Sequence, residues 1–221
     1  MMFFYRIVKR EFDILFAVLF LLVFSPIFVI TIIVIKIVSP GPVFYKARRV
    51  GLHGNVFTCY KFRSMRVDSG KVKLTTLQND NRIFPFGYFI RKAKIDEMPQ
   101  VFNILLGQMT VVGPRPEDVA NVRVLYCGEY KRILDIKPGL TSPASLYDYT
   151  HGEKYEDERL YETEFVPQKL ALELYYVKNR GLLYDTQLIL RTAYIIVMTL
   201  LGKQYFKKPK ELDMIRMSVK Q

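Results

Sequence analysis

The sequence of 221 residues contains no tryptophan, two cysteines and two histidines. Cys59 and Cys127 lie far apart and have no C-x-x-C spacing. We therefore expect buried apolar thiols in a reducing, cytoplasmic setting rather than a disulfide or a metal site. His53 and His151 are equally isolated, so nothing in this small set of soft ligands indicates a zinc centre.

Acidic residues are also scarce. Asp and Glu number 21 against 33 Lys and Arg, which leaves a formal net charge of +12. Between Lys36 and Arg66 there are seven basic residues and no acidic one. Such an excess fits an anionic partner, which could be phospholipid, nucleotide phosphate or nucleic acid. The length leaves room for one domain beyond a membrane segment.

Charge is absent altogether from residues 14–35. As a straight helix these positions would cover about 33 Å, close to the hydrocarbon thickness of a bilayer. Ser25 and Pro26 lie in the middle, where the proline removes a backbone donor and the serine hydroxyl can satisfy the carbonyl that is freed. Basic residues flank both ends, whereas a spanning helix usually has its Lys and Arg excess on one side. We therefore predict a re-entrant membrane helix broken at Ser25-Pro26, with a kinked single span, an uncleaved signal anchor and a buried soluble helix as alternatives.

The rest of the chain is predicted to form a mainly helical α+β domain with a small β element. The proline at position 99 would lie in the first turn of a helix that begins near Asp96 and ends before Gly107. The other predicted elements are a hairpin of residues 43–46 and 56–62, a polar loop at 68–81, rigid turns at 111–117 and 137–141, helices at 118–126, 155–180 and 182–202, and a basic tail from 203 that is loosely ordered or rests on lipid.

Asp96 and Glu97 form an adjacent carboxylate pair at a predicted helix start. Neighbours on a helix point about 100° apart, so one carboxylate could act as nucleophile or base while the other holds a divalent cation. Basic residues at 91, 92 and 94 and the helix N-terminus favour the ionised form. The alternative is a charge pair that merely caps a helix.

Two further segments carry basic side chains in a defined setting. Pro114 and Pro116 fix the backbone around Arg115, so its guanidinium can be presented to phosphate with little ordering cost. Alternation along residues 60–66 places Lys61 and Arg63 on one side of a strand. A stiff connection and a half-buried strand with a charged face would give the same patterns.

Taken in order, these pieces resemble the bacterial sugar transferases, the monotopic phosphoglycosyl transferases, over residues 5–202. The segments that carry the resemblance are Lys9-Arg10, Ser25-Pro26, Ser39-Pro-Gly-Pro-Val-Phe-Tyr-Lys46, Tyr60-Lys-Phe-Arg-Ser-Met65, Ile95-Asp-Glu-Met-Pro-Gln100 and Val112-Gly-Pro-Arg-Pro116.

The resemblance implies an enzyme that transfers a sugar-1-phosphate from a UDP-sugar to a polyprenyl phosphate such as undecaprenyl phosphate and releases UMP. It places the catalytic domain on the cytoplasmic face of the bacterial inner membrane, at the first membrane step of a glycan pathway. Asp96 would attack the β-phosphate and carry a covalent phosphosugar, and Glu97 would bind Mg²⁺. Arg91 would bind phosphate, and we expect Lys61, Arg63 and Arg115 to do the same. Asp185 would pair with a basic residue of the N-terminal helix, Lys9 or Arg10.

One segment departs from the family pattern. Many members continue the Lys-Pro-Gly-Leu-Thr turn as Gly-Trp-Ala-Gln-Val-Asn-Gly-Arg, whereas this chain has Ser-Pro-Ala-Ser-Leu-Tyr-Asp-Tyr-Thr at residues 142–150. The sugar therefore stays open. We expect a membrane segment at 1–40, a catalytic domain with interfacial helices at 41–202 and a basic tail at 203–221. The expected partners are the two substrates and phospholipid, without nucleic acid, and a homodimer is left open.

Two other classes of function also fit parts of the sequence. The charge of +12 and the 31 Phe and Tyr side chains would suit a membrane-anchored protein that binds nucleic acid or anionic lipid. The carboxylate pair would also suit a Mg²⁺-dependent hydrolase of diphosphates, which would release free sugar phosphate without a lipid acceptor.

Overall fold

The computed structural model describes residues 2–67, 82–152, 155 and 157–219, so the predicted loop at 68–81 lies outside the described residues. The described part is mainly helical, as predicted, and it has two small sheets where one small β element was predicted. Its α-helices are α1 Met2–Val38, α2 Pro85–Lys92, α3 Gln100–Leu105, α4 Val119–Leu125, α5 Pro143–His151, α6 Glu158–Leu160, α7 Val166–Asn179, α8 Leu182–Leu200 and α9 Lys210–Val219. The strands are β1 Phe44–Val50, β2 Val56–Phe62, β3 Thr110–Val112 and β4 Gly139–Thr141.

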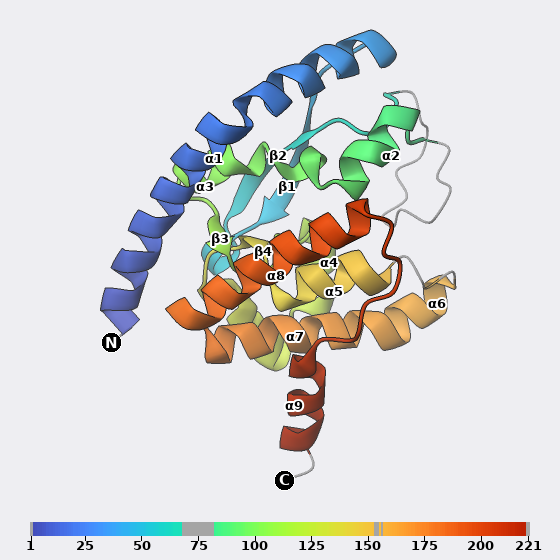
Figure 1. Cartoon of the computed structure of the whole chain (residues 1–221). Helices are drawn as coiled ribbons and strands as arrows, with labels where there is room; N and C mark the ends of the chain where they lie inside the picture. Colours follow the sequence, from blue (N-terminus) through green and yellow to red (C-terminus); the bar gives the residue numbers. More distant parts are fainter. Residues whose placement is uncertain (1, 68–81, 153–154, 156, 220–221) are drawn as a thin grey trace.

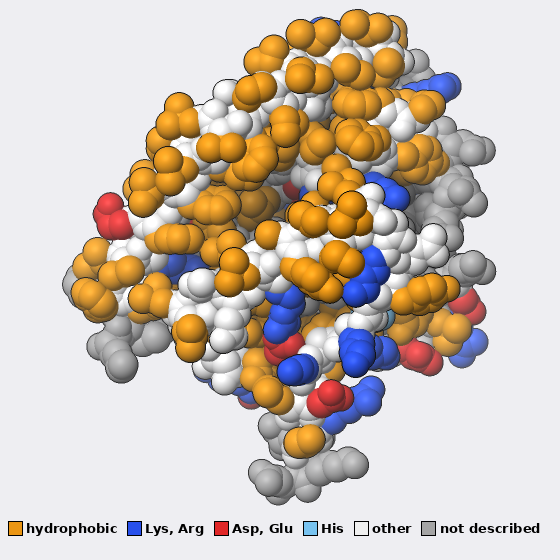
Figure 2. Space-filling view, in the orientation of Figure 1, with side chains coloured by type: hydrophobic (Ala, Val, Ile, Leu, Met, Phe, Trp, Pro, Cys, Tyr) orange, Lys and Arg blue, Asp and Glu red, His pale blue; other side chains and the backbone are white. Residues whose placement is uncertain are grey.

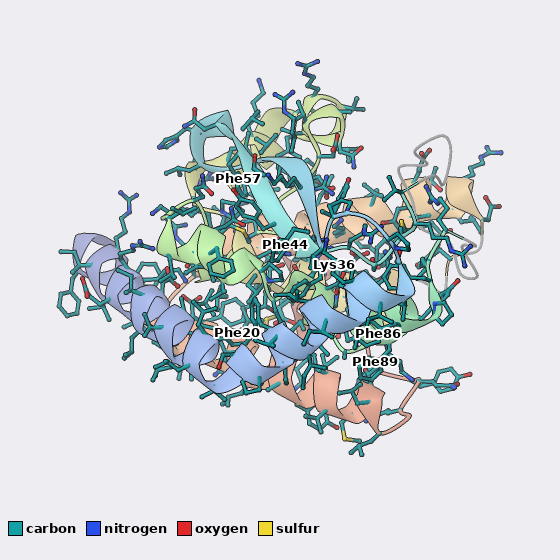
Figure 3. The ribbon with its side chains drawn as sticks, turned by 90° about the horizontal axis from the view of Figure 1, so that it is seen from above. Phe20, Lys36, Phe44, Phe57, Phe86 and Phe89 are labelled. Atoms are coloured by element: carbon teal, nitrogen blue, oxygen red, sulfur yellow. The ribbon has the colours of Figure 1, made fainter. Side chains whose placement is uncertain are left out.

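Helix α1 continues through Pro26 as a single bent helix. The two halves meet at an angle, with Phe20 on one and Lys36 on the other (Figure 3). The Ser25 hydroxyl donates a hydrogen bond to the Leu22 carbonyl at 3.0 Å, which is the carbonyl that Pro26 has no N–H to reach. The predicted break at Ser25-Pro26 is therefore a bend within one continuous helix, because this hydroxyl replaces the missing backbone bond.

The two sides of α1 differ in what they contact. Ala17, Phe28 and Ile35 are buried against α3 and the hairpin, whereas Leu22 and Ile37 are exposed. Apolar side chains cover the outer side of α1 in Figure 2, and α1 follows one side of the molecule in Figure 1. Among the described residues it is the one helix long and apolar enough to cross a membrane. These features are compatible with membrane association.

Strands β1 and β2 pair antiparallel, with Lys46 opposite Tyr60. The predicted hairpin is confirmed, although β1 extends to Val50 because its later residues also pair with β2. The two predicted turns contain the short parallel pair β3 and β4. A β-carbon on Gly139 would lie 2.0 Å from the backbone nitrogen of Gly113, so this pairing requires glycine.

Helices α5, α7 and α8 form the opposite side of the domain (Figure 1). The predicted helix at 155–180 is present as α6, a π-helical turn at Tyr161–Phe165 and α7. The prediction of a loosely ordered tail is wrong for α9, because Leu212 packs among side chains of α5 and α7 and Glu211 pairs with Arg191 on α8. Cys59 is buried as expected, but Cys127 is exposed, which the sequence did not indicate.

Candidate active site

Asp96 and Glu97 lie on the 3-10 turn Ile95–Glu97 between α2 and α3. Lys94, which precedes this turn, has a left-handed backbone with φ of 58° and reverses the chain after α2. The prediction of an α-helix that begins at the pair is wrong, because α3 begins only at Gln100, after Pro99. Both carboxylates are buried, with 8% of Asp96 and 7% of Glu97 exposed.

Three cations surround the Glu97 carboxylate. Lys61 Nζ lies 2.8 Å and Arg115 Nη2 lies 3.1 Å from Glu97 Oε1, and Lys94 Nζ lies 3.9 Å from Oε2. Burial alone would raise the pKa of Glu97, but these cations together hold it well below its ordinary value. The structure thus brings Lys61 and Arg115 together at the carboxylate pair.

Asp96 has the opposite environment. Its Oδ1 atom is buried and accepts no hydrogen bond from any described residue. Burial and the neighbouring Glu97 charge raise the pKa of Asp96, while Lys61, Lys94 and Arg91 oppose that rise. A buried carboxylate oxygen without a donor is costly, and beside the cations around Glu97 it is a candidate position for a ligand group.

Asn103 holds the strand that carries Lys61 in place. Its side-chain oxygen accepts the Tyr60 N–H at 3.1 Å, and its amide nitrogen donates to the Thr58 carbonyl and to Gln108 Oε1, each at 2.7 Å. These bonds satisfy the free edge of β2 and fix it against α3. Sequence reasoning did not assign this role, and the available signal was an asparagine between apolar residues of α3.

Arg115 is held from behind by Glu173 on α7. The Arg115 N–H donates to Glu173 Oε1 at 2.8 Å, and the Ser142 hydroxyl donates to the same oxygen at 3.2 Å. Burial raises the pKa of Glu173 to about 7. Sequence reasoning missed Glu173 because its helical spacing looks like that of any other α7 residue. Arg115 lies between Pro114 and Pro116, as the prediction of a rigid turn required.

Helix α5, which the sequence left unassigned, lies beside the carboxylate pair. Asp148 Oδ2 is 3.9 Å from Arg115 Nε. The Tyr149 hydroxyl donates to the Lys92 carbonyl, and Lys94 Nζ lies 4.6 Å from the centre of the Tyr149 ring. The segment that departs from the family pattern therefore forms one wall of the site.

The other two predicted phosphate ligands lie in different surroundings. Arg91, in the last turn of α2, is half-buried and close enough to Asp96 to lower its pKa, and it forms no ion pair with a described residue. The Arg63 guanidinium donates instead to the Ser39 and Pro40 carbonyls after α1. The structure does not bring Arg63 to the carboxylate pair, because its guanidinium is hydrogen-bonded to these carbonyls just after α1.

Charged residues near the start of α1 clasp the domain. Lys9 Nζ lies 2.5 Å from Asp185 Oδ2 on α8, so of the two predicted basic partners Lys9 is the one that pairs with Asp185. Arg10 donates to the Ile104 and Leu105 carbonyls at the end of α3. Asp13 accepts from the Thr110 hydroxyl and the Val111 N–H of β3. Three elements around the site, α8, α3 and β3, are thus fixed to α1.

The donor set suits a hard cation only if a substrate adds ligands. Among the described residues no group of three or more His, Cys, Asp and Glu side chains could hold a metal by itself. Mg²⁺ is commonly bound by one or two carboxylates together with substrate phosphates. The orphaned oxygen of Asp96 and the less tightly paired Oε2 of Glu97 fit that mode.

The chain is similar to known proteins over most of its length. The sequence model of the family described as bacterial sugar transferase matches residues 4–199. The UDP-glucose:undecaprenyl-phosphate glucose-1-phosphate transferase of Escherichia coli K12 is 32% identical over 197 residues, 86% of this chain and 40% of the relative. The undecaprenyl-phosphate galactose phosphotransferase of Salmonella typhimurium is 35% identical over 214 residues, with 87% and 41% covered.

A shorter relative is matched over nearly the whole of its own length. The exopolysaccharide production protein PSS of Rhizobium leguminosarum bv. phaseoli is 35% identical over 194 residues, 85% of this chain and 94% of the relative. The chain spans about two-fifths of the length of the Escherichia coli and Salmonella relatives. The match to the family model includes α1 from Phe4 onward, the carboxylate pair and Arg115. The chain belongs to the bacterial sugar transferase family.

Proposed function

We propose that this chain transfers a sugar-1-phosphate from a UDP-sugar to undecaprenyl phosphate. The relatives named for this kind of reaction support the substrate classes. The observation that carries the proposal is the pairing of a buried Asp96 oxygen that has no donor with a neighbouring Glu97 surrounded by Lys61, Lys94 and Arg115. Cations in a buried site stabilise the charge of a diphosphate and of its transition state.

The proposed reaction has two steps. Asp96 attacks the β-phosphorus of the donor, a bond forms between its carboxylate oxygen and phosphorus, and the bond from this phosphorus to the oxygen of UMP breaks. UMP leaves with that oxygen. A phosphate oxygen of undecaprenyl phosphate then attacks the same phosphorus and frees Asp96, which yields the lipid-linked diphosphate sugar. The covalent intermediate allows UMP to depart before the lipid arrives.

Charged side chains of the chain itself hold the reactants. Arg115, placed by its bond to Glu173, and Lys61, placed by Asn103, would contact diphosphate oxygens beside the nucleophile. Arg91 and Lys94 lie near Asp96 and favour its ionised form. Glu97 would hold Mg²⁺ together with donor phosphate oxygens. When bound, the ion supplies charge neutralisation of the diphosphate.

We place the reaction at the cytoplasmic face of the bacterial inner membrane. One substrate is a soluble dianion and the other a lipid with a phosphate head, so they can meet only at the membrane surface. The bend of α1 at Pro26 and the clasp at Lys9, Arg10 and Asp13 support a re-entrant helix that keeps both its ends and the domain on one side.

The test is UMP release by the purified chain with a panel of UDP-sugars, with and without undecaprenyl phosphate. Acceptor-dependent turnover should fall about a thousandfold or more in Asp96→Asn, because the nucleophile is lost. Glu129→Gln, which alters an exposed ion pair with Lys178, is the matched control and should keep full activity. Unchanged turnover in Asp96→Asn, or free sugar phosphate formed without acceptor, would contradict the proposal.

A further inference from the structure

Helix α5 is connected to the carboxylate pair by two separate contacts. Arg115 bridges Glu97 and Asp148, with Nη2 3.1 Å from Glu97 Oε1 and Nε 3.9 Å from Asp148 Oδ2. Lys94 lies between Glu97 Oε2 and the ring of Tyr149. A ligand group held by Arg115 or Lys94 at Glu97 would therefore also lie close to α5.

The Asp148 carboxylate keeps its capacity to accept hydrogen bonds. The side chain is one-quarter exposed, and no described residue donates a hydrogen bond to it. At 3.9 Å its contact with Arg115 is an ion pair without a hydrogen bond. An ionised carboxylate has about four acceptor positions, so this wall of the site presents an acceptor that the protein does not satisfy.

Helix α5 is also fixed at both ends. The Ser142 hydroxyl caps its start by accepting the Ser145 N–H at 2.9 Å and donates to Glu173. Near its end, Tyr149 is bound to the Lys92 carbonyl next to the turn of the carboxylate pair. The Asp148 carboxylate is thus placed on a rigid element, as a group that discriminates between ligands must be.

The charge of Asp148 indicates which part of the donor it contacts. A carboxylate repels diphosphate oxygens, and Arg115 stands between it and Glu97. Two parts of the donor remain, the uridine and the sugar. Asp96 reacts at the phosphate that carries the sugar, and Arg115 links Asp148 to Glu97 next to Asp96, so the sugar is the part closer to Asp148. Resting on the proposed function, we infer that Asp148 is a specificity-determining residue that accepts hydrogen bonds from hydroxyl or amino groups of the donor sugar and disfavours sugars that carry a carboxylate.

The test compares kcat/KM of the wild type and Asp148→Asn for UDP-glucose, UDP-galactose, their N-acetylamino counterparts and UDP-glucuronic acid. The ratio of the preferred neutral donor to UDP-glucuronic acid should fall about tenfold or more in Asp148→Asn, because a charge-assisted hydrogen bond is lost and a repulsion removed. A purely structural role, including a displaced Arg115, would lower all donors by one common factor and leave the ratios unchanged.

Controls separate this inference from the reaction itself. Asp148→Asn should unfold within a few degrees of the wild type, and Glu129→Gln should keep every donor ratio. Donor ratios that change less than threefold in Asp148→Asn would overturn the inference while UMP release by the wild type upholds the proposed function. A wild type that releases UMP from no donor would contradict both.

Discussion

At the scale of single residues, the site depends on carboxylates with opposite surroundings. Glu97 is stabilised as an anion by Lys61, Lys94 and Arg115, whereas burial favours the neutral form of Asp96. Asp96, Glu97, Lys61 and Arg115 could be named from sequence because their motifs are short and continuous, whereas Arg63, named in the same way, does not lie at the pair. Asn103 and Glu173 could not, because their contacts join residues 45 and 58 positions apart, which no local pattern records.

Glu173 makes the stability of the fold dependent on pH. Its pKa is raised from 4.5 to about 7 by burial, so the folded state binds a proton more tightly than the unfolded state does. The resulting stabilisation is fully present below about pH 4.5 and is lost as pH rises to about 7, by roughly 3 kcal/mol. The Glu173→Gln variant should not show this loss. The difference in Tm, Glu173→Gln minus wild type, should therefore be larger at pH 8 than at pH 5.

The measurement is thermal unfolding of both forms in detergent between pH 4.5 and 8. The glutamine can still accept from the Arg115 N–H, so the fold should be retained. The Glu129→Gln variant, whose carboxylate is exposed, should follow the wild-type curve. Parallel curves for wild type and Glu173→Gln over this range would contradict the assignment of a buried, proton-binding Glu173.

At the scale of elements, α1 and the short turns are where sequence and structure differ most. Proline correctly predicted a disturbance at position 26, but whether a helix bends or breaks depends on a single hydroxyl and on packing against α3. The strands β3 and β4 have three residues each, too few for an alternation pattern to be recognised. The sequence of helix α5 shows no clear periodicity of apolar and polar residues. Its helical structure is explained by its burial against α7.

The clasp between α1 and α8 is expected to contribute measurably to stability. Asp185 accepts from Tyr5, Tyr176 and Lys9 and is almost fully buried. Asp185→Leu leaves the Lys9 ammonium without its partner and should cost about 3 kcal/mol in the free energy of unfolding. The double variant Lys9→Met with Asp185→Leu should recover most of that loss, because no unpaired charge remains.

Thermal or denaturant unfolding in detergent of the wild type, Asp185→Leu and the double variant measures these differences in stability. Arg49→Met provides the control, since Arg49 and Asp118 form a more exposed pair whose loss should cost below about 1 kcal/mol. A double variant as unstable as Asp185→Leu alone would show that the Lys9 charge is not what makes the single change costly.

At the scale of the whole molecule, the proposed location of the site at a membrane surface depends on one bent helix, α1. The general architecture was predictable, because an uncharged segment, a basic flank and a mainly helical remainder are compositional features. The way that Lys9, Arg10 and Asp13 join α1 to α8, α3 and β3 was not predictable from spacing alone. The one contact expected in advance was a pair between Asp185 and either Lys9 or Arg10, and that expectation came from the resemblance.

The proposed re-entrant topology predicts that both ends of α1 lie on the same side of the membrane. On a Cys127→Ser background, Phe4→Cys and Lys46→Cys should both react with a membrane-impermeant thiol reagent from the cytoplasmic side of inverted vesicles. Both positions are exposed in the structure and flank the apolar segment. Cys59 is buried and should not react. Labelling of the two positions from opposite sides would show that α1 spans the membrane.

We propose above all that Asp96 carries a covalent phosphosugar during the reaction. The most direct measurement is intact and peptide mass spectrometry of the purified chain after incubation with its UDP-sugar and Mg²⁺ but without lipid acceptor, followed by an acid quench. We expect an added mass of one phosphosugar on the peptide that contains Asp96, lost when undecaprenyl phosphate is added and never formed by Asp96→Asn. A phosphosugar on another residue, or acceptor-dependent turnover without any adduct, would contradict the account.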